Sequence, residues 1–224
     1  MMRIDIVSAV PSSMQSYVGA SIIKIAEEKN LAEIHIHNLH DFTKNPKHRI
    51  DDYPFGGGAG MLIKCEPVFN IVEKLKSERN YDDVIFMCAD GEIFNQSLAN
   101  EYSLKENIII IAGHYKGIDQ RIRDEIVTRE ISLGDFVLSG GELPALVFAD
   151  AVIRLIPGVI GDAESALSDS HMDGLLESPQ YTRPSDFRGQ KVPDVLLGGN
   201  HKKIDEWRQE KSLEKTKELR PDLL

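Results

Sequence analysis

An uninterrupted apolar segment near the middle of the chain, residues 107–112 (NIIIIA), constrains the fold most. Its four consecutive isoleucines place β-branched side chains on both faces of an extended segment, so other parts of the chain must cover both faces. Such a run is typical of a central strand in a parallel sheet, whose strands are joined by crossovers that are usually helices. The segment therefore predicts an α/β protein with helices on both faces of a parallel sheet.

The rest of the sequence fits this alternation. Further strands are predicted at residues 3–8, 33–39, 84–88 and 125–131, and helices at residues 11–26, 67–79, 95–102 and 144–156. The turn after the first strand (SAVP) contains no glycine, and the sequence has no P-loop motif. Both observations argue against a dinucleotide-binding Rossmann unit and against a P-loop nucleotide hydrolase.

Composition narrows the class of protein. The 224 residues, 42% hydrophobic and 28% charged, are enough for one large domain or two modest ones. A net charge of −10, taken alone, argues against a nucleic-acid partner, although local clusters of basic residues decide such binding. Cys65 and Cys88 lack the spacing of a disulfide framework or a zinc site, so no metal site is predicted. No targeting or membrane-spanning segment is visible, and a cytoplasmic location is expected.

Residues 40–60 form a long polar segment between the second strand and the next helix. Basic residues (Lys44, Lys47, His48, Arg49) are followed there by the aromatic residues Tyr53 and Phe55, and a glycine-rich run (GGGAG) ends the segment. Basic and aromatic residues together suit a nucleic-acid contact, because bases stack on rings and phosphates pair with cations. A solvated surface loop explains the same residues equally well.

Three loops follow predicted strands: residues 87–91, 113–119 and 133–144. The carboxyl ends of parallel strands meet at one edge of a sheet, where ligands of such sheets bind. The third loop contains Gly134, Gly140 and Gly141, which let the backbone approach a ligand closely, and the carboxylates Asp135 and Glu142. A tight strand-to-helix turn without a ligand is the alternative for this loop alone.

Three regions are predicted along the chain. Residues 1–158 form the α/β domain, residues 159–173 a flexible linker rich in acidic and small residues, and residues 174–224 a small, mostly helical second domain. Basic residues of the second domain, Arg183 and Arg188 among them, offer a contact for a polyanion.

Ordered motifs across nearly the whole chain resemble the bacterial tRNA (guanine-N1)-methyltransferases of the TrmD family, in the SPOUT class. The motifs are Asp41-Phe-Thr, His48-Arg49, Asp51-Asp52, residues 56–61 (GGGAGM), 117–119 (GID), 134–135 (GD), 137–145 (VLSGGELPA), Arg154 with 156–159 (IPGV), 181–184 (YTRP) and 199–201 (GNH). The resemblance implies a parallel sheet with a deep trefoil knot, a small C-terminal domain that binds tRNA, and a homodimer. It also implies methyl transfer from S-adenosylmethionine to N1 of the guanosine immediately 3′ of the anticodon.

The resemblance further implies roles for individual residues. Asp169 is the expected general base and Arg154 the expected stabiliser of charge on guanine O6. Gly58, Gly60 and Arg183 are expected to contact the substrate. The expected cofactor site consists of Met87, Gly113, Tyr115, Leu133, Gly134, Asp135, Phe136, Val137, Leu138, Gly140, Gly141 and Pro144.

The chain departs from the family pattern at two of these loops. His114 and Lys116 stand where the family usually has arginine and glutamate, and residues 88–90 (CAD) replace its Ser-Pro-Gln. These changes leave open whether Mg²⁺ takes part in the reaction. The alternatives to the expected function are a SPOUT methyltransferase that acts on another RNA site and a non-catalytic RNA-binding homologue.

Overall fold

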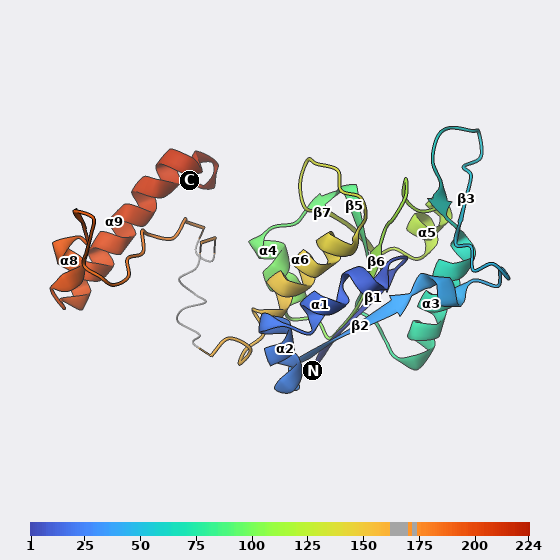
Figure 1. Ribbon diagram of the computed structural model, residues 1–224, viewed down its shortest axis with the longest axis horizontal. Coiled ribbons are helices and arrows are strands. Elements are labelled where there is room, and N and C mark those ends of the chain that lie inside the picture. Colours follow the sequence, from blue (N-terminus) through green and yellow to red (C-terminus); the bar gives the residue numbers. More distant parts are fainter. Residues whose placement is uncertain (162–169, 172–173) are drawn as a thin grey trace. The chain divides into compact units, whose positions relative to one another are not determined.

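The computed structural model describes residues 1–161, 170–171 and 174–224. The chain divides into two compact units, Met1–Gly161 and Asp162–Leu224 (Figure 1). Within the described residues, no helix combines the length and apolar character needed to cross a membrane.

A five-stranded parallel sheet forms the centre of the first unit. Its strands are β1 (Met2–Ser8), β2 (Ala32–Asn38), β5 (Asp83–Ile93), β6 (Asn107–Ala112) and β7 (Arg129–Ser132), in the order β2-β1-β6-β5-β7. All neighbouring pairs are parallel. The isoleucine-rich segment is β6, the middle strand, which confirms the expectation of a parallel α/β sheet.

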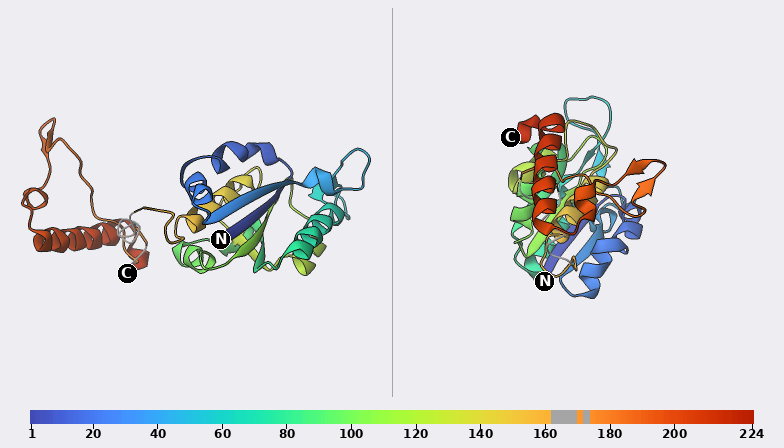
Figure 2. Two further views of the ribbon diagram at one scale, coloured as in Figure 1. Left: turned by 90° about the horizontal axis from the view of Figure 1, so that it is seen from below. Right: turned by 90° about the vertical axis from the view of Figure 1, so that its left-hand side faces the viewer.

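Helices cover both faces of the sheet (Figure 2). On one face lie α2 (Ser21–Glu28), α4 (Gln96–Tyr102) and α6 (Glu142–Ile153); on the other lie α3 (Cys65–Glu78) and α5 (Gln120–Glu125). The isoleucines of β6 alternate between the two cores: Ile108 and Ile110 pack with the first set of helices, Ile109 and Ile111 with the second. One strand thus holds both hydrophobic cores together, as its sequence requires.

Two predicted elements differ from the structure. The single helix expected at residues 11–26 is broken into η1 (Pro11–Ser13), α1 (Gln15–Val18) and α2, with Ser21 in the left-handed region at φ 51°. The strand expected from residue 125 begins at Arg129, because residues 120–125 form α5. Asp119 caps α5 by accepting a hydrogen bond from the amide of Arg121, which stabilises a helix start that the strand prediction overlooked.

The long segment after β2 is more ordered than a solvated loop. It contains η2 (Leu39–Phe42), and β3 (Asp51–Asp52) pairs antiparallel with β4 (Leu62–Ile63). Buried Ile50 and Ile63 anchor this hairpin in the core. Its glycine tip, residues 56–60, contains Gly56, Gly57, Gly58 and Gly60 at positive φ. The tip projects from the unit as the loop above β3 in Figure 1.

The second unit combines a short hairpin with helices. The hairpin pairs β8 (Asp186–Phe187) with β9 (Gln190–Lys191), and α8 (Asp194–Leu197), α9 (His201–Leu219) and η3 (Pro221–Leu223) follow. Asn200 caps α9 by accepting from the amide of Lys203. Thr216 is buried in α9 and accepts a hydrogen bond from the amide of Leu176, which attaches the segment after residue 174 to this helix.

Candidate active site

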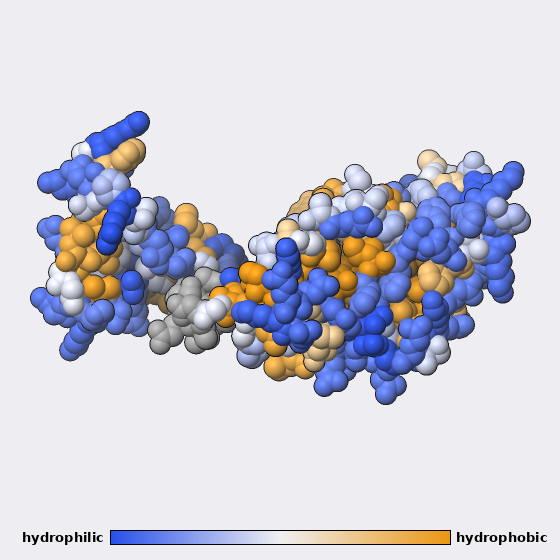
Figure 3. Space-filling view, turned by 60° about the horizontal axis from the view of Figure 1, so that its bottom comes forward, coloured by the Kyte–Doolittle hydropathy of each residue, from blue (hydrophilic) through white to orange (hydrophobic). Residues whose placement is uncertain are grey.

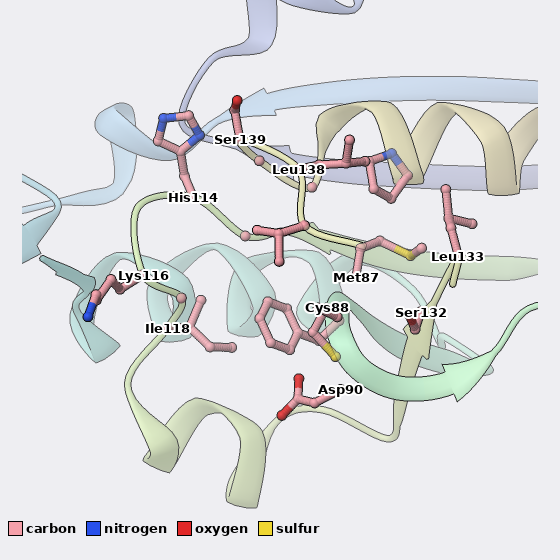
Figure 4. A pocket seen from close by; sticks show the side chains of 18 of the residues that line it. Met87, Cys88, Asp90, His114, Lys116, Ile118, Ser132, Leu133, Leu138 and Ser139 are labelled. Carbon is pink, nitrogen blue, oxygen red and sulfur yellow. The ribbon is translucent and has the colours of Figure 1, made fainter. Parts of the chain in front are cut away.

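A cavity of about 310 Å³ opens where β5, β6 and β7 reach their carboxyl ends. Residues from three segments line it, 86–90, 113–118 and 132–144, together with Arg123 (Figure 4). The convergence of the three loops, which the sequence predicts, is confirmed. This edge is where parallel α/β sheets place their ligands.

A detour in β5 forms one wall of the cavity. Met87 and Glu92 both pair with Ile131 of β7, so residues 88–91 leave the ladder and return to it. Gly91 lies close to β7: a Cβ atom there would stand 2.6 Å from the carbonyl carbon of Glu130. Glycine is needed at this point because two backbones meet with no room for a side chain.

Arg123 of α5 holds this wall in place. Its guanidinium donates to both carboxylate oxygens of Asp90, at 2.8 and 2.9 Å, and to both of Glu130, also at 2.8 and 2.9 Å. It also lies over the ring of Phe86, 5.2 Å from the centroid. Hydrogen bonding to Arg123 holds the pKa of Asp90 below its ordinary value, so this carboxylate is ionised and fully paired.

The same wall contains a group that could in principle hold a metal ion. Ligand atoms of Cys88, Asp90 and Glu130 lie within 4.8 Å of one another. Burial, together with a hydrogen bond to Asp90, raises the pKa of Cys88 to about 11, so its thiol stays protonated at neutral pH. Mg²⁺ requires available oxygen ligands, and Arg123 already neutralises both carboxylates. This donor set does not fit Mg²⁺.

The other two walls, residues 113–118 and 132–144, contact each other through backbone atoms. The amide of Gly141 donates to the carbonyl of Gly113 at 2.6 Å, and His114 forms an isolated β-bridge with Gly140. A Cβ on Gly141 would lie 2.6 Å from the amide nitrogen of Gly113 and 2.8 Å from Cα of Ala112. These are backbone atoms of a central strand, so they cannot move aside as a flexible side chain could.

Glu142 ties the start of α6 to β1. Its carboxylate is buried and accepts a hydrogen bond from the hydroxyl of Ser8 at 2.8 Å. The same hydroxyl accepts from the amide of Val10 at 2.8 Å, and Nδ1 of His114 lies 3.8 Å from the carboxylate. The first turn of a helix favours a negative charge. Glu142 is thus held by structural contacts beneath the cavity.

The loop at residues 133–141 presents apolar side chains and backbone groups. Gly134 has φ 147°, and the hydroxyl of Ser132 donates to its carbonyl at 3.1 Å. Phe136, Val137 and Leu138 are exposed, Val137 by 88%. Exposed apolar side chains beside backbone amides and carbonyls suit a flat, uncharged ring whose polar edge forms hydrogen bonds with the backbone.

All but one of the residues predicted to bind the cofactor line this cavity. Those that do are Met87, Gly113, Tyr115, Leu133, Gly134, Phe136, Val137, Leu138, Gly140, Gly141 and Pro144. Asp135 belongs to the same loop but does not line the cavity. Their role in cofactor binding remains a prediction.

The residues predicted to act on the substrate are dispersed. Gly60 packs on Lys116 of the cavity, whereas no described atom lies within 4 Å of a Cβ built on Gly58. Arg154 follows the last residue of α6. Arg183 lies in the second unit, where it lines a separate cavity of about 440 Å³. Asp169 lies outside the described residues.

Three residues of the cavity lie outside the three predicted loops: Phe86, Ser132 and Arg123. Phe86 and Ser132 each directly precede a predicted loop, Phe86 within β5 and Ser132 at the end of β7. Other lining residues lie within these loops but were not predicted to bind the cofactor: Cys88, Ala89, Asp90, His114, Lys116, Gly117, Ile118 and Ser139. Arg123 was missed because no helix was predicted at residues 120–125, of which only Glu125 had been included in the predicted strand. The cap at Asp119 would have revealed that helix.

A parallel sheet with a glycine-lined cavity at its carboxyl edge defines an α/β protein that binds a small ligand by its loops. Comparison with known families is more specific, because the chain matches the model of the tRNA (Guanine-1)-methyltransferase TrmD family over residues 2–224. The protein belongs to this family.

Curated relatives match over the full length. The tRNA (guanine-N(1)-)-methyltransferase of Bacteroides thetaiotaomicron is 58% identical over 223 residues, which cover 100% of this chain and 99% of that protein. The enzymes of the same name from Chlorobaculum tepidum and Flavobacterium psychrophilum are 57% and 56% identical; both alignments cover 100% of this chain, with 97% and 99% of the relative.

Proposed function

We propose that this protein transfers the methyl group of S-adenosylmethionine to N1 of the guanosine immediately 3′ of the anticodon in tRNA. The full-length match to tRNA (guanine-1)-methyltransferases carries the proposal. The cavity at the carboxyl edge supports it, because its walls consist of the loops that the resemblance assigns to the cofactor.

The cavity residues fit S-adenosylmethionine. The adenine ring would lie on the apolar side chains of residues 136–138, with its polar edge read by backbone groups of the same loop. The glycines at 113 and 141 keep side chains out of the cavity walls, so that backbone groups would contact the ligand there. The proposal includes a deep trefoil knot, and the backbone contact of Gly141 with Gly113 supports it, because a chain threaded through a loop must pass another chain segment closely.

The reaction requires a base. Guanine N1 carries a proton at neutral pH, and its lone pair becomes available for attack only as that proton leaves. The carboxylate of Asp169 would accept the proton, and general base catalysis typically contributes about 10²- to 10⁴-fold to the rate. Arg154 would stabilise the negative charge that spreads to O6. When bound, S-adenosylmethionine supplies an electrophilic methyl group on a positively charged sulfur.

The second unit is proposed to bind the tRNA through Arg183 and neighbouring basic residues. The predicted bounds, 159–173 for a linker and 174–224 for the tRNA-binding domain, belong to this proposal. The two free cysteines, Cys65 and Cys88, are consistent with a cytoplasmic location, which is proposed as well.

A homodimer is also proposed. Leu143 and Val147, one turn apart on α6, are 62% and 49% exposed. Exposed Tyr17 joins this face, since its hydroxyl donates to Asp150 of α6 at 3.1 Å. Hydrophobic residues gather on the surface of the first unit in Figure 3. Such a face on a helix next to the cavity suits contact with a second copy of the chain.

Methyl transfer to two tRNA transcripts tests the function. The transcripts differ by carrying guanosine or adenosine after the anticodon, and incorporation of a labelled methyl group is measured. We expect the full-length protein to methylate only the guanosine form. The variant Asp169→Asn should lose about 10²- to 10⁴-fold in turnover, while calorimetry should show unchanged binding of S-adenosylmethionine. Asp124→Asn, an exposed position on α5, is the matched control and should retain activity.

The other outcomes separate the alternatives. Methylation of both transcripts would point to another RNA site as the target. Binding of S-adenosylmethionine and tRNA without methylation would indicate a non-catalytic homologue. Full turnover by Asp169→Asn would remove Asp169 as the base.

A further inference from the structure

Lys116 presents an ammonium group between the cavity and the glycine tip of the β3–β4 hairpin. The side chain lines the cavity. Gly60 of the tip lies against its aliphatic stem, because a Cβ on Gly60 would stand 2.8 Å from Cγ and 3.0 Å from Cδ of Lys116. Figure 4 shows the amine at the edge of the lining side chains, directed away from Asp90.

The backbone of this lysine is fixed to the hairpin. Its amide donates to the carbonyl of Met61 at 3.1 Å, and Ile63 donates to Gly117 at 3.0 Å. Asp119 completes the pairing by donating to Ile63 at 3.0 Å. The ammonium group therefore stands at the end of an exposed side chain whose backbone and aliphatic stem are held against the hairpin.

Lys116 differs from the other basic residues of the cavity in its partners. Arg123 is paired with Asp90 and Glu130, and His114 faces Glu142. Over residues 1–161, 170–171 and 174–224, no carboxylate forms a salt bridge with the ammonium group of Lys116. This charge is available to a ligand that reaches both the cavity and the glycine tip.

The possible metal ligands among the residues that line the cavity support the same conclusion. Asp90 is the carboxylate among its described lining residues, and Arg123 binds both of its oxygens. A divalent cation would have to displace that guanidinium to gain an oxygen ligand there. The described residues that line the cavity thus supply a positive charge where the substrate is expected, and their one carboxylate, Asp90, is already paired.

We propose that Lys116 is a further catalytic residue, whose ammonium group stabilises the negative charge developing on guanine O6, and that methyl transfer therefore requires no divalent cation. In the step, a bond forms between N1 and the methyl carbon while the carbon–sulfur bond breaks and leaves its electron pair on sulfur. The N1 proton passes to the general base, and Lys116 keeps its protons. This inference rests on the proposed function and on the predicted contact of Gly58 and Gly60 with the guanosine.

The test compares methylation with and without divalent cations. The guanosine transcript is kept folded with spermidine, and turnover by the full-length protein is measured in Mg²⁺ or in excess EDTA. We expect equal turnover in both. Lys116→Met should lower kcat about 10²-fold, as the loss of one stabilising group at a developing oxyanion does, and should leave the KM for S-adenosylmethionine unchanged. Lys24→Met, at an exposed position on α2, is the matched control.

A charge reversal makes the test sharper. Lys116→Glu should be as slow as Lys116→Met in EDTA and should recover part of its kcat when Mg²⁺ is added, because it creates an oxygen ligand at this position. Thermal unfolding identifies any variant that fails to fold, and Lys116→Gln then replaces it.

The outcomes distinguish this inference from the function itself. Loss of wild-type turnover in EDTA, an unchanged kcat in Lys116→Met, or a change confined to the KM for S-adenosylmethionine would each overturn the role of Lys116 and leave the function standing. Absence of methylation under every condition would instead remove the proposed function.

Discussion

The contact between Gly141 and Gly113 makes Gly141→Ala the most informative change in the first unit. The new methyl group would stand 2.6 Å from the amide nitrogen of Gly113 and 3.0 Å from the carbonyl carbon of Ala112. Ordinary contact begins at 3.4 Å. Because every nearby atom belongs to the backbone of β6 or its loop, relief requires that the two cavity walls separate.

The size of the effect follows from the distance. The walls must separate by about 0.8 Å, the difference between 2.6 and 3.4 Å, which would stretch the 2.6 Å hydrogen bond from Gly141 to Gly113 beyond its usual range. Overpacking of this kind costs about 1–3 kcal/mol. For a chain of this size, each kcal/mol corresponds to about 2–4 °C in melting temperature. We expect a decrease of roughly 2–12 °C.

Thermal unfolding and calorimetry measure the two consequences. Gly141→Ala should melt at a lower temperature than the wild type. It should also bind S-adenosylmethionine at least about tenfold more weakly, which corresponds to a loss of about 1.4 kcal/mol of binding free energy when the cavity walls separate. Gly161→Ala is the matched control: no described atom lies within 4 Å of its added Cβ, and its φ is not positive.

The reasoning would be refuted if Gly141→Ala matched the wild type in both melting temperature and affinity. It would also be refuted if Gly161→Ala lowered both as strongly, because the effect would then belong to any glycine lost from the chain rather than to the contact.

Two further predictions concern titratable groups. Burial alone would raise the pKa of Asp5, but hydrogen bonds from His37, Arg3 and Tyr81 outweigh it and hold this pKa far below its ordinary value. The ionised Asp5 carboxylate therefore stabilises the folded state above about pH 4, and this stabilisation is lost as the pH falls further. Asp5→Asn lacks the carboxylate, so its free energy of unfolding, measured with urea, should fall less between neutral and acidic pH than that of the wild type. An equal fall in both proteins would contradict this prediction. Burial raises the pKa of Cys88 to about 11, so its thiol should react with iodoacetamide at pH 8 more slowly than the amino acid cysteine in solution. Mass spectrometry measures the rate, and equal rates would show that the thiol is not shielded.

The layered architecture could be predicted because local pattern and tertiary environment agree in it. The isoleucines of β6 require burial on both sides wherever they lie, and the structure places them between two cores. The edge that carries the cavity follows from strand direction alone. For these features, the sequence and a few rules of geometry suffice.

The features that escaped prediction depend on distant segments. Ser21 adopts a positive φ that nothing in its neighbours requires. Gly91 and Gly141 are needed because other strands approach them, and no local motif reveals which backbone lies 2.6 Å away. The pairing of Arg123 with Asp90 joins residues far apart in the sequence through a short helix that was not predicted. Side-chain contacts of this kind appear only once the sheet is assembled.

The detour in β5 has a consequence for how this protein can change. Residues 88–91 are attached to β7 at both ends, because Met87 and Glu92 pair with the same residue, Ile131. Exchange of the side chains of residues 88–90 would alter what the cavity offers a ligand and leave the sheet in register, whereas Gly91 has no room for a side chain. An inserted or deleted residue would lengthen or shorten the path outside the ladder, and Glu92 and Ile93 would keep their partners while a glycine stays against Glu130. The fixed point of this wall is therefore the glycine at its return to β7.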